Sequence, residues 1–191
     1  MIMVALIGSE GTGKTTVFRE IQKTRPNWVY FSEPTRRTIP RIGYADPWVL
    51  IEEVGIAFYE SLMLSQWCVL DREANPTISS ADVIVLDRCP ADNLAYYFME
   101  RTQDEQRFEH IFVSLCKHYV NLIDNFFFFP SGVFPCHTDG LRRPSSQQSF
   151  ECELLKALSL LGVVPIAIQQ TCVSHRVKEI VDAIDAMKKG N

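Results

Sequence analysis

The chain has 191 residues, of which 47% are hydrophobic and 22% charged, a composition that indicates one globular domain with a substantial core and excludes a disordered or fibrous protein. Its net charge of -4 provides no general attraction to nucleic acid, so contact with a polyanion would need a local basic patch. The six cysteines are dispersed without metal-ligand spacing, and residues 1–7 lack a signal-peptide pattern. These features predict reduced thiols and a cytoplasmic protein.

The first half of the chain alternates between uncharged β-prone runs and segments of helical periodicity. In chain order they predict a strand at 2–7, a helix at 14–23, a strand at 28–31, a helix at 47–73 and a strand at 83–86. The polar residues 32–37 are a candidate functional loop, because Pro34 keeps Glu33 out of helical geometry. The helix at 47–73 begins at Asp46-Pro47, and its apolar positions are Leu50, Val54, Phe58, Leu62 and Leu70.

The second half predicts helices at 91–100 and 105–123, a strand at 126–129, a helix at 150–161, a strand at 163–168 and a helix at 174–188. One face of the helix at 105–123 carries Phe108, Ile111, Phe112, Leu115, Tyr119 and Leu122. Residues 130–149 are rich in Pro, Gly and Ser, which is typical of a lid or binding loop. The pattern predicts a single α/β domain over residues 1–191, and its most apolar late run is too short to cross a membrane.

A phosphate-binding pattern lies between the first predicted strand and the first predicted helix. Residues 8–15, GSEGTGKT, match G-x-x-x-x-G-K-[ST] at every fixed position. Backbone N–H groups of such a turn surround phosphates, while Lys14 would bridge the β- and γ-phosphates of ATP and Thr15 would bind Mg²⁺. The predicted ATP-binding residues are Gly8, Glu10, Gly11, Thr12, Gly13, Lys14, Thr15 and Thr16.

The residues at the end of the third predicted strand help to distinguish between the classes of protein that contain this loop. The chain lacks the N-K-x-D and D-x-x-G strings of GTPases, and Asp87 is followed by Arg88 rather than by a second carboxylate that could activate water. A cation beside the carboxylate favours holding an anionic acceptor over hydrolysis. The sequence therefore predicts a phosphotransferase.

Three separated segments resemble those of small P-loop kinases. Residues 87–96, DRCPADNLAY, resemble the D-R-x-x-x-S-x-x-A-Y segment of thymidylate kinases and the E-R-S segment of deoxynucleoside kinases, and Glu33-Pro34 resembles their E-P pair. Residues 139–142, DGLR, are similar to the D-G-x-R lid segment of kinase-like ATPases that include ribosylnicotinamide kinases and phage proteins. The resemblance implies a P-loop NTPase three-layer sandwich with about five parallel strands and an arginine-bearing lid. Asp92 occupies the position where thymidylate kinases have serine. The resemblance therefore implies the class of small P-loop kinases and does not imply thymidylate as the acceptor.

The resemblance implies roles for three residues around the transferred group. Glu33 would accept the proton of the attacking hydroxyl or orient it, although a loop carboxylate paired with Arg36 or Arg37 is the alternative. Asp87 would hold Mg²⁺ or the acceptor hydroxyl, with a helix cap as the alternative. Arg88 would orient the acceptor through its planar guanidinium.

Further arginines and aromatic residues are candidates for binding the substrates. The resemblance implies that Arg142, with Arg143, closes over ATP, and the alternative is an exposed loop. For Arg36 and Arg37, the sequence favours two interpretations equally: binding of an acceptor phosphate, or a charged side chain exposed to solvent. Aromatic residues that could stack on a base, although helical spacing favours core packing, are Trp48, Phe58, Tyr59, Tyr96 and Tyr97.

The leading functional hypothesis is an ATP- and Mg²⁺-dependent kinase that phosphorylates a hydroxyl or phosphate of a nucleoside or nucleotide. A second hypothesis makes the acceptor a 5'-end or a hydroxymethylpyrimidine in DNA, as in phage DNA modification in the host cytoplasm; its basic groove would use Arg36, Arg37, Arg41, Arg142 and Arg143. A third is an ATP-binding switch without an acceptor. The acceptor and the oligomeric state do not follow from the residues.

Overall fold

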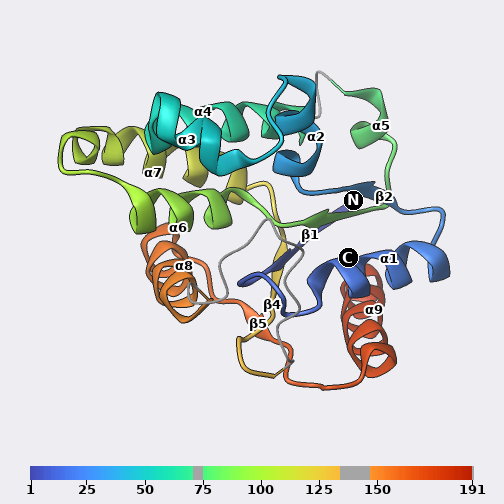
Figure 1. The fold of residues 1–191 in the computed structure, drawn as a ribbon. Coiled ribbons are helices and arrows are strands. Elements are labelled where there is room, and N and C mark those ends of the chain that lie inside the picture. The colour runs from blue at the N-terminus through green and yellow to red at the C-terminus, as the bar shows by residue number, and fades with distance from the viewer. Residues whose placement is uncertain (71–74, 134–146, 191) are drawn as a thin grey trace.

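A parallel sheet of five strands, in the order β2-β3-β1-β4-β5, forms the centre of the computed structural model, which describes residues 1–70, 75–133 and 147–190 (Figure 1). The strands are β1 (Ile2–Ile7), β2 (Val29–Phe31), β3 (Val83–Asp87), β4 (Asn125–Phe128) and β5 (Ile166–Ala167). All six residues of β1 are buried, because β3 and β4 pair with its two edges and helices cover both of its faces. The predicted sheet of about five parallel strands is confirmed.

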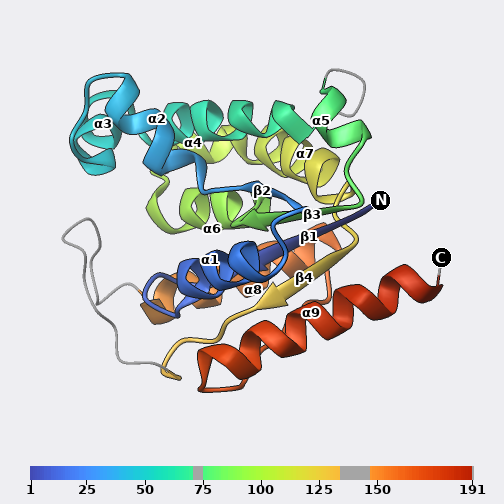
Figure 2. The same ribbon diagram turned by 90° about the vertical axis from the view of Figure 1, so that its right-hand side faces the viewer.

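Helices pack on both faces of the sheet (Figure 2). On one face, α1 (Lys14–Thr24) and α9 (Val173–Gly190) bury an apolar cluster with the side chains of β1 that point toward them. The other face packs against α4 (Ile56–Ser65), α6 (Pro90–Glu100), α7 (Glu109–Val120) and α8 (Gln147–Leu161). The shorter elements are α2 (Pro34–Arg41), α3 (Pro47–Val54), α5 (Pro76–Ser79) and the 3-10 helices η1 (Gln66–Leu70) and η2 (Asp104–Phe108).

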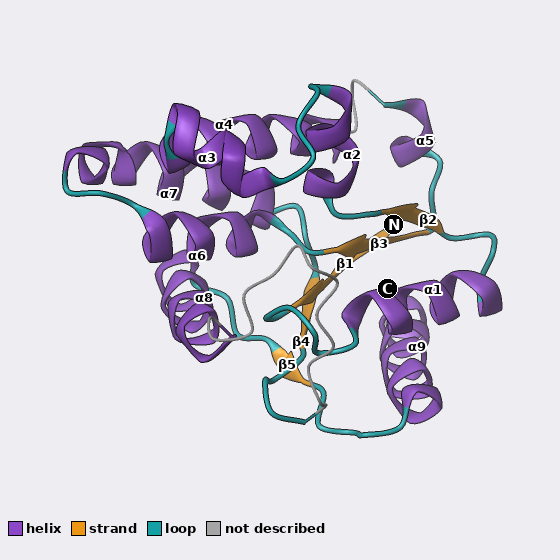
Figure 3. Ribbon diagram, viewed as in Figure 1, coloured by secondary structure: helices purple, strands orange, loops and turns teal. Residues whose placement is uncertain are grey.

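The carboxyl ends of β1, β2 and β3 meet at one edge of the sheet (Figure 3). Parallel strands place the residues that follow them at the same edge, which is where open α/β sheets bind ligands. The predicted phosphate-binding loop follows β1, Glu33 follows β2, and Arg88 follows β3. Three segments far apart in the chain are thereby brought together.

Two expectations for residues 32–73 are wrong. The expected functional loop at 32–37 ends at Glu33, because Pro34 occupies the first position of α2, where its fixed φ and missing N–H are favourable. The expected single helix at 47–73 is divided at Gly55, whose φ of 81° and ψ of 159° end α3 and begin α4. A side chain at Gly55 would also meet Glu105 Oε1 at 2.8 Å. The break changes the buried face, so Val54 and Phe58 are exposed rather than in the core.

Three expectations for the second half are also corrected. The segment predicted as one helix at 105–123 comprises η2 and α7, and α7 buries Phe112, Cys116 and Val120, whereas Ile111 and Leu115 are exposed. The strand expected at 163–168 pairs only at Ile166–Ala167. The lid expected at 130–149 ends earlier, since α8 begins at Gln147. Arg142 and Arg143 lie outside the described residues.

Within the ranges that the structure covers, none of the helices combines the length and apolar character that spanning a membrane would require. The cysteines described are free thiols, of which Cys89 and Cys116 are buried and Cys68, Cys152 and Cys172 are exposed.

Candidate phosphoryl-transfer site

The turn between β1 and α1 needs glycine at three positions. Gly8, Gly11 and Gly13 have φ angles of 136°, 70° and 86°. A side chain at Gly8 would meet the Phe129 carbonyl oxygen at 2.5 Å. Gly13 is the N-cap of α1 and is in the left-handed conformation, so the turn leads directly into the N-terminus of a helix, which favours an anion. The predicted turn between a strand and a helix is confirmed, and phosphate binding by residues 8–15 stays a prediction.

Lys14 lies buried against the turn that it follows. Its Nζ donates to the Ser9 carbonyl oxygen at 2.5 Å and to Thr12 Oγ1 at 3.3 Å. Burial lowers the pKa of Lys14 to about 7, and the positive charge of Arg88 acts in the same direction. A triphosphate in the turn would supply negative charge to this desolvated ammonium group. Thr16, also predicted to bind ATP, is exposed in the first turn of α1.

Thr15 and Asp87 form a pair of oxygen ligands beside Lys14. Thr15 Oγ1 donates to Asp87 Oδ2 at 3.0 Å, and Asp87 ends β3 next to Leu6 of β1. Burial raises the pKa of Asp87, and the charge of Lys14 opposes this effect. A hydroxyl and a carboxylate suit Mg²⁺, which takes few protein ligands and completes its shell with phosphates and water. In the described ranges there is no group of three or more His, Cys, Asp or Glu side chains that could hold a metal by themselves.

Arg88 lies at the centre of a buried ionic cluster. Its Nε is 3.0 Å from Glu33 Oε1, and its Nη1 is 3.2 Å from Asp92 Oδ1. The guanidinium also lies over the rings of Tyr96 and Phe150, at 5.5 and 5.7 Å from their centroids. Its φ of 75° is in the left-handed region, which costs a non-glycine residue about 1–2 kcal/mol. The side chain is buried in the site rather than exposed to solvent.

Glu33 is held by two arginines. Besides Arg88, it pairs with Arg36, whose Nε is 3.3 Å from Glu33 Oε2, and its side chain is only 12% exposed. The pairing with Arg36 that was the alternative interpretation of Glu33 is therefore present, but the carboxylate also belongs to the buried Arg88 cluster. Asp92 completes the cluster: Cys89 N–H donates to its Oδ2 at 3.0 Å at the start of α6.

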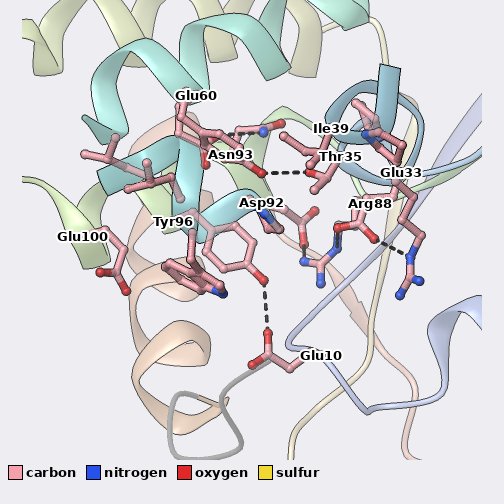
Figure 4. Close-up of a pocket in the computed structure, with 18 of the residues that line it drawn as sticks. Glu10, Glu33, Thr35, Ile39, Glu60, Arg88, Asp92, Asn93, Tyr96 and Glu100 are labelled. Carbon is pink, nitrogen blue, oxygen red and sulfur yellow. Dashed lines mark hydrogen bonds and ion pairs between the residues drawn. The ribbon is translucent and has the colours of Figure 1, made fainter. Parts of the chain in front are cut away.

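A cavity of about 240 Å³ opens beside this cluster (Figure 4). It reaches from Glu10 of the turn, past Glu33 and Arg88, to residues of α2, α3, α4 and α6. Of the aromatic candidates, Trp48, Tyr59 and Tyr96 line it. Tyr97 instead stacks on Phe112 in the core with ring centroids 4.3 Å apart, and Phe58 is exposed. Arg36 lines the cavity, whereas Arg37 is an exposed residue that does not.

Several residues of the site were not singled out by the sequence. Glu60, Trp67 and Asn93 line the cavity, and the available signal for Glu60 was a lone carboxylate within the apolar run of α4. Arg176 of α9 is buried and donates from Nη1 to the Thr12 carbonyl oxygen at 2.8 Å. These two residues are 164 positions apart, and no local pattern connects them.

The family follows from a sequence comparison, because a family model described as an AAA domain (AAA_28) matches residues 3–176. The chain belongs to this AAA domain family. No curated protein matches it by sequence.

Solved structures resemble the whole chain in fold. NadR in complex with NAD and AMP-PNP is similar with a TM-score of 0.69 and 20% identity, and the match covers 98% of this chain but 49% of NadR, so the chain spans about half the length of that protein. Deoxyadenosine kinase from M. mycoides with bound dATP has a TM-score of 0.66 and 14% identity, covering 97% of this chain and 100% of the kinase. Shikimate kinase from Acinetobacter baumannii, in complex with shikimate, has a TM-score of 0.59 and 15% identity, and the match covers 98% of this chain and 95% of the kinase. At these identities the likeness establishes the fold, and the predicted P-loop nucleoside and nucleotide kinase-like fold is confirmed.

Proposed function

We propose that this chain is an ATP- and Mg²⁺-dependent kinase that transfers the γ-phosphoryl group to a hydroxyl of a nucleoside-like acceptor. One observation carries the proposal: Glu10 of the turn that would hold the phosphates lines the same cavity as the Glu33–Arg88–Asp92 cluster. An acceptor in this cavity would therefore lie next to the end of a triphosphate held between residues 8 and 15.

Charge favours a hydroxyl over a phosphate as the accepting group. The described residues that line the cavity include the carboxyl groups of Glu10, Glu33, Glu60, Asp92 and Glu100 but only two arginines, Arg36 and Arg88. Both arginines are paired with carboxylates. An acceptor phosphate would have to displace these pairs and approach further carboxyl groups, whereas a sugar hydroxyl can donate to Glu33 without such a cost.

In the proposed reaction, Lys14 and the backbone N–H groups of the turn bind and orient the phosphates of ATP. Glu33 takes the proton of the acceptor hydroxyl as the hydroxyl oxygen forms its bond to the γ-phosphorus, and the bond from that phosphorus to the bridging oxygen breaks, releasing ADP. Arg88 acts as a positioning residue that holds the Glu33 carboxylate beside Asp92. Thr15 and Asp87 would hold Mg²⁺, which when bound draws negative charge from the phosphate oxygens.

The neighbours and the cavity walls support a nucleoside as the acceptor. Structural neighbours include NadR in complex with NR and deoxyadenosine kinase with bound dCTP. Shikimate kinase has the same fold, so fold alone does not select a nucleoside. In this chain, Trp48, Tyr59 and Tyr96 provide aromatic surfaces in the cavity on which a base can stack.

The substitution Glu33→Gln tests the proposal, because it removes the proton acceptor but keeps the size of the side chain. We expect ATP-dependent phosphorylation of adenosine, cytidine or their deoxy forms to fall roughly 100- to 10,000-fold, with AMP-PNP affinity retained. Glu52→Gln, an exposed carboxylate of α3 outside the cavity, is the matched control.

Unchanged transfer in Glu33→Gln would contradict the assigned role. Hydrolysis of ATP at a rate that no nucleoside stimulates would favour the switch hypothesis instead. Transfer to the 5'-end of DNA or to hydroxymethylpyrimidine DNA, with free nucleosides inert, would favour the polynucleotide hypothesis.

A further inference from the structure

A group of polar side chains lines the cavity, and Figure 4 shows two of its members, Glu60 and Asn93, on the side away from Glu10. It comprises Glu60 of α4, Trp67 of η1 and Asn93 of α6, and the Glu60 and Trp67 residues are each only 1% exposed. Asn93 Nδ2 donates to Glu60 Oε2 at 2.7 Å, and Trp67 Nε1 donates to Asn93 Oδ1 at 2.9 Å. The proposed phosphoryl transfer uses none of these residues.

The hydrogen bonds determine which way each group points. An indole N–H can only donate, so the Asn93 carbonyl oxygen must face Trp67 and its amide NH₂ must face Glu60. Glu60 Oε2 is therefore an acceptor. When Glu60 is neutral, its proton resides on Oε1, which then offers an O–H donor. Among the described residues, Asn93 is the one hydrogen-bond partner of Glu60.

Burial favours the neutral form of Glu60 when the cavity holds no ligand. Burial raises the pKa of Glu60 to about 8, against the stabilising hydrogen bond from Asn93 and the charge of Arg88. The other titratable groups that face it from the packed elements are Glu33 before α2, Tyr59 of α4, Asp92 of α6 and Cys116 of α7. The two carboxylates oppose its ionisation.

The surroundings make such a donor selective. Apolar and aromatic side chains, including Ile51, Ile56 and Tyr59, line the cavity near it. A ligand that cannot pair with a buried polar group leaves that group unsatisfied, and such mismatches discriminate between substrates far more strongly than the loss of an apolar contact.

We propose that Glu60, whose Oε2 is held by Asn93, determines acceptor specificity by donating a hydrogen bond from Oε1 to an acceptor atom on the edge of the acceptor's heterocycle. The ligand class is a nucleoside whose base presents an unprotonated ring nitrogen or a carbonyl oxygen, with its ring between the aromatic walls. The inference rests on the proposed function, since it requires the acceptor to occupy this cavity.

Binding of adenosine and cytidine, measured by calorimetry from pH 6 to pH 9, tests the assignment. Both bases carry a ring-nitrogen acceptor and do not titrate in this range. For the nucleoside that binds more tightly, we expect the wild-type affinity to decrease above pH 8, by a factor that approaches ten for each pH unit, because the O–H donor is lost. Glu60→Gln, whose amide can donate in the same direction, should bind within about threefold of wild type at pH 6 and remain independent of pH.

Glu60→Met, which has no donor, should lose roughly 10- to 100-fold in nucleoside affinity at pH 6. AMP-PNP affinity reports whether each variant is folded, and Glu52→Gln is the control for loss of a carboxylate. Wild-type affinity in Glu60→Met, or an affinity that rises with pH in the wild type, would overturn the role of Glu60 and leave the kinase proposal intact. If neither nucleoside binds the wild type while AMP-PNP does, the proposed acceptor class and this assignment both fall.

Discussion

Replacing Glu60 by Gln should make the protein more stable, and increasingly so as the pH rises from 5 to 7. The substitution keeps the shape of the side chain and its acceptor for Asn93 Nδ2, but it removes the ionisable group. Glu60 is 1% exposed, so solvent screens its charge little.

The magnitude follows from the shifted titration of Glu60. Its pKa rises from 4.5 in the unfolded chain to about 8 in the folded protein, chiefly through burial. Between these values the folded state keeps a proton that the unfolded state has lost, so stability falls as the pH rises, by up to about 1.4 kcal/mol per unit. From pH 5 to pH 7 the wild type should lose about 2–3 kcal/mol through this residue alone. That is a large part of the stability of a typical domain, about 5–15 kcal/mol.

Urea denaturation of wild type, Glu60→Gln and Glu52→Gln at pH 5, 6 and 7 measures the effect. Shifted groups whose pKa does not depend on Glu60, such as Lys14, titrate alike in all three proteins and cancel in the difference. The free-energy advantage of Glu60→Gln over wild type should grow by about 2–3 kcal/mol across this range, whereas Glu52→Gln should run parallel to wild type. Parallel curves for wild type and Glu60→Gln would refute the reasoning that Glu60 is buried and neutral.

Two further predictions concern the turn between β1 and α1. Burial lowers the pKa of Lys14 to about 7, and bound phosphates would raise it again. AMP-PNP binding above pH 7 should therefore take up a proton and weaken as the pH rises. Calorimetry in buffers of different ionisation enthalpy measures both effects, and a binding heat that is the same in every buffer would contradict the prediction. Gly8→Ala should destabilise the fold by roughly 1–3 kcal/mol in urea denaturation, since its Cβ would meet the Phe129 carbonyl at 2.5 Å, and an unchanged midpoint would argue against that turn geometry.

Local patterns were sufficient where neighbouring residues determine the structure. The uncharged run of β1 and the glycine and lysine spacing after it predicted a buried strand, a phosphate-binding turn and a helix, because backbone geometry there depends on residues close in sequence. The succession of Asp87 and Arg88 at the end of a predicted strand favoured a phosphotransferase, and the predicted strand end is confirmed. The same local reasoning failed at Gly55, where periodicity continued across a break imposed by the backbone.

The course of residues 34–41 shows a different limit. Pro34 disfavours helix for the residue before it, which was predicted, and favours helix for the residues after it, which was not. Glu33 was therefore placed correctly outside a helix, while the helix that carries Arg36 to the cavity was missed.

By itself, the sequence determined the alternation of strands and helices, the glycine-rich turn between β1 and α1, and the class of fold, since these depend on periodicity and on short motifs. Only the tertiary structure decided that Glu33, Arg88 and Asp92 form one buried cluster, and that Glu60, Trp67 and Asn93 lie together in the cavity beside it. The physical reason is that burial and low polarity, which set the protonation of Glu60 and the pairing of Arg88, arise from contacts between residues distant in the chain.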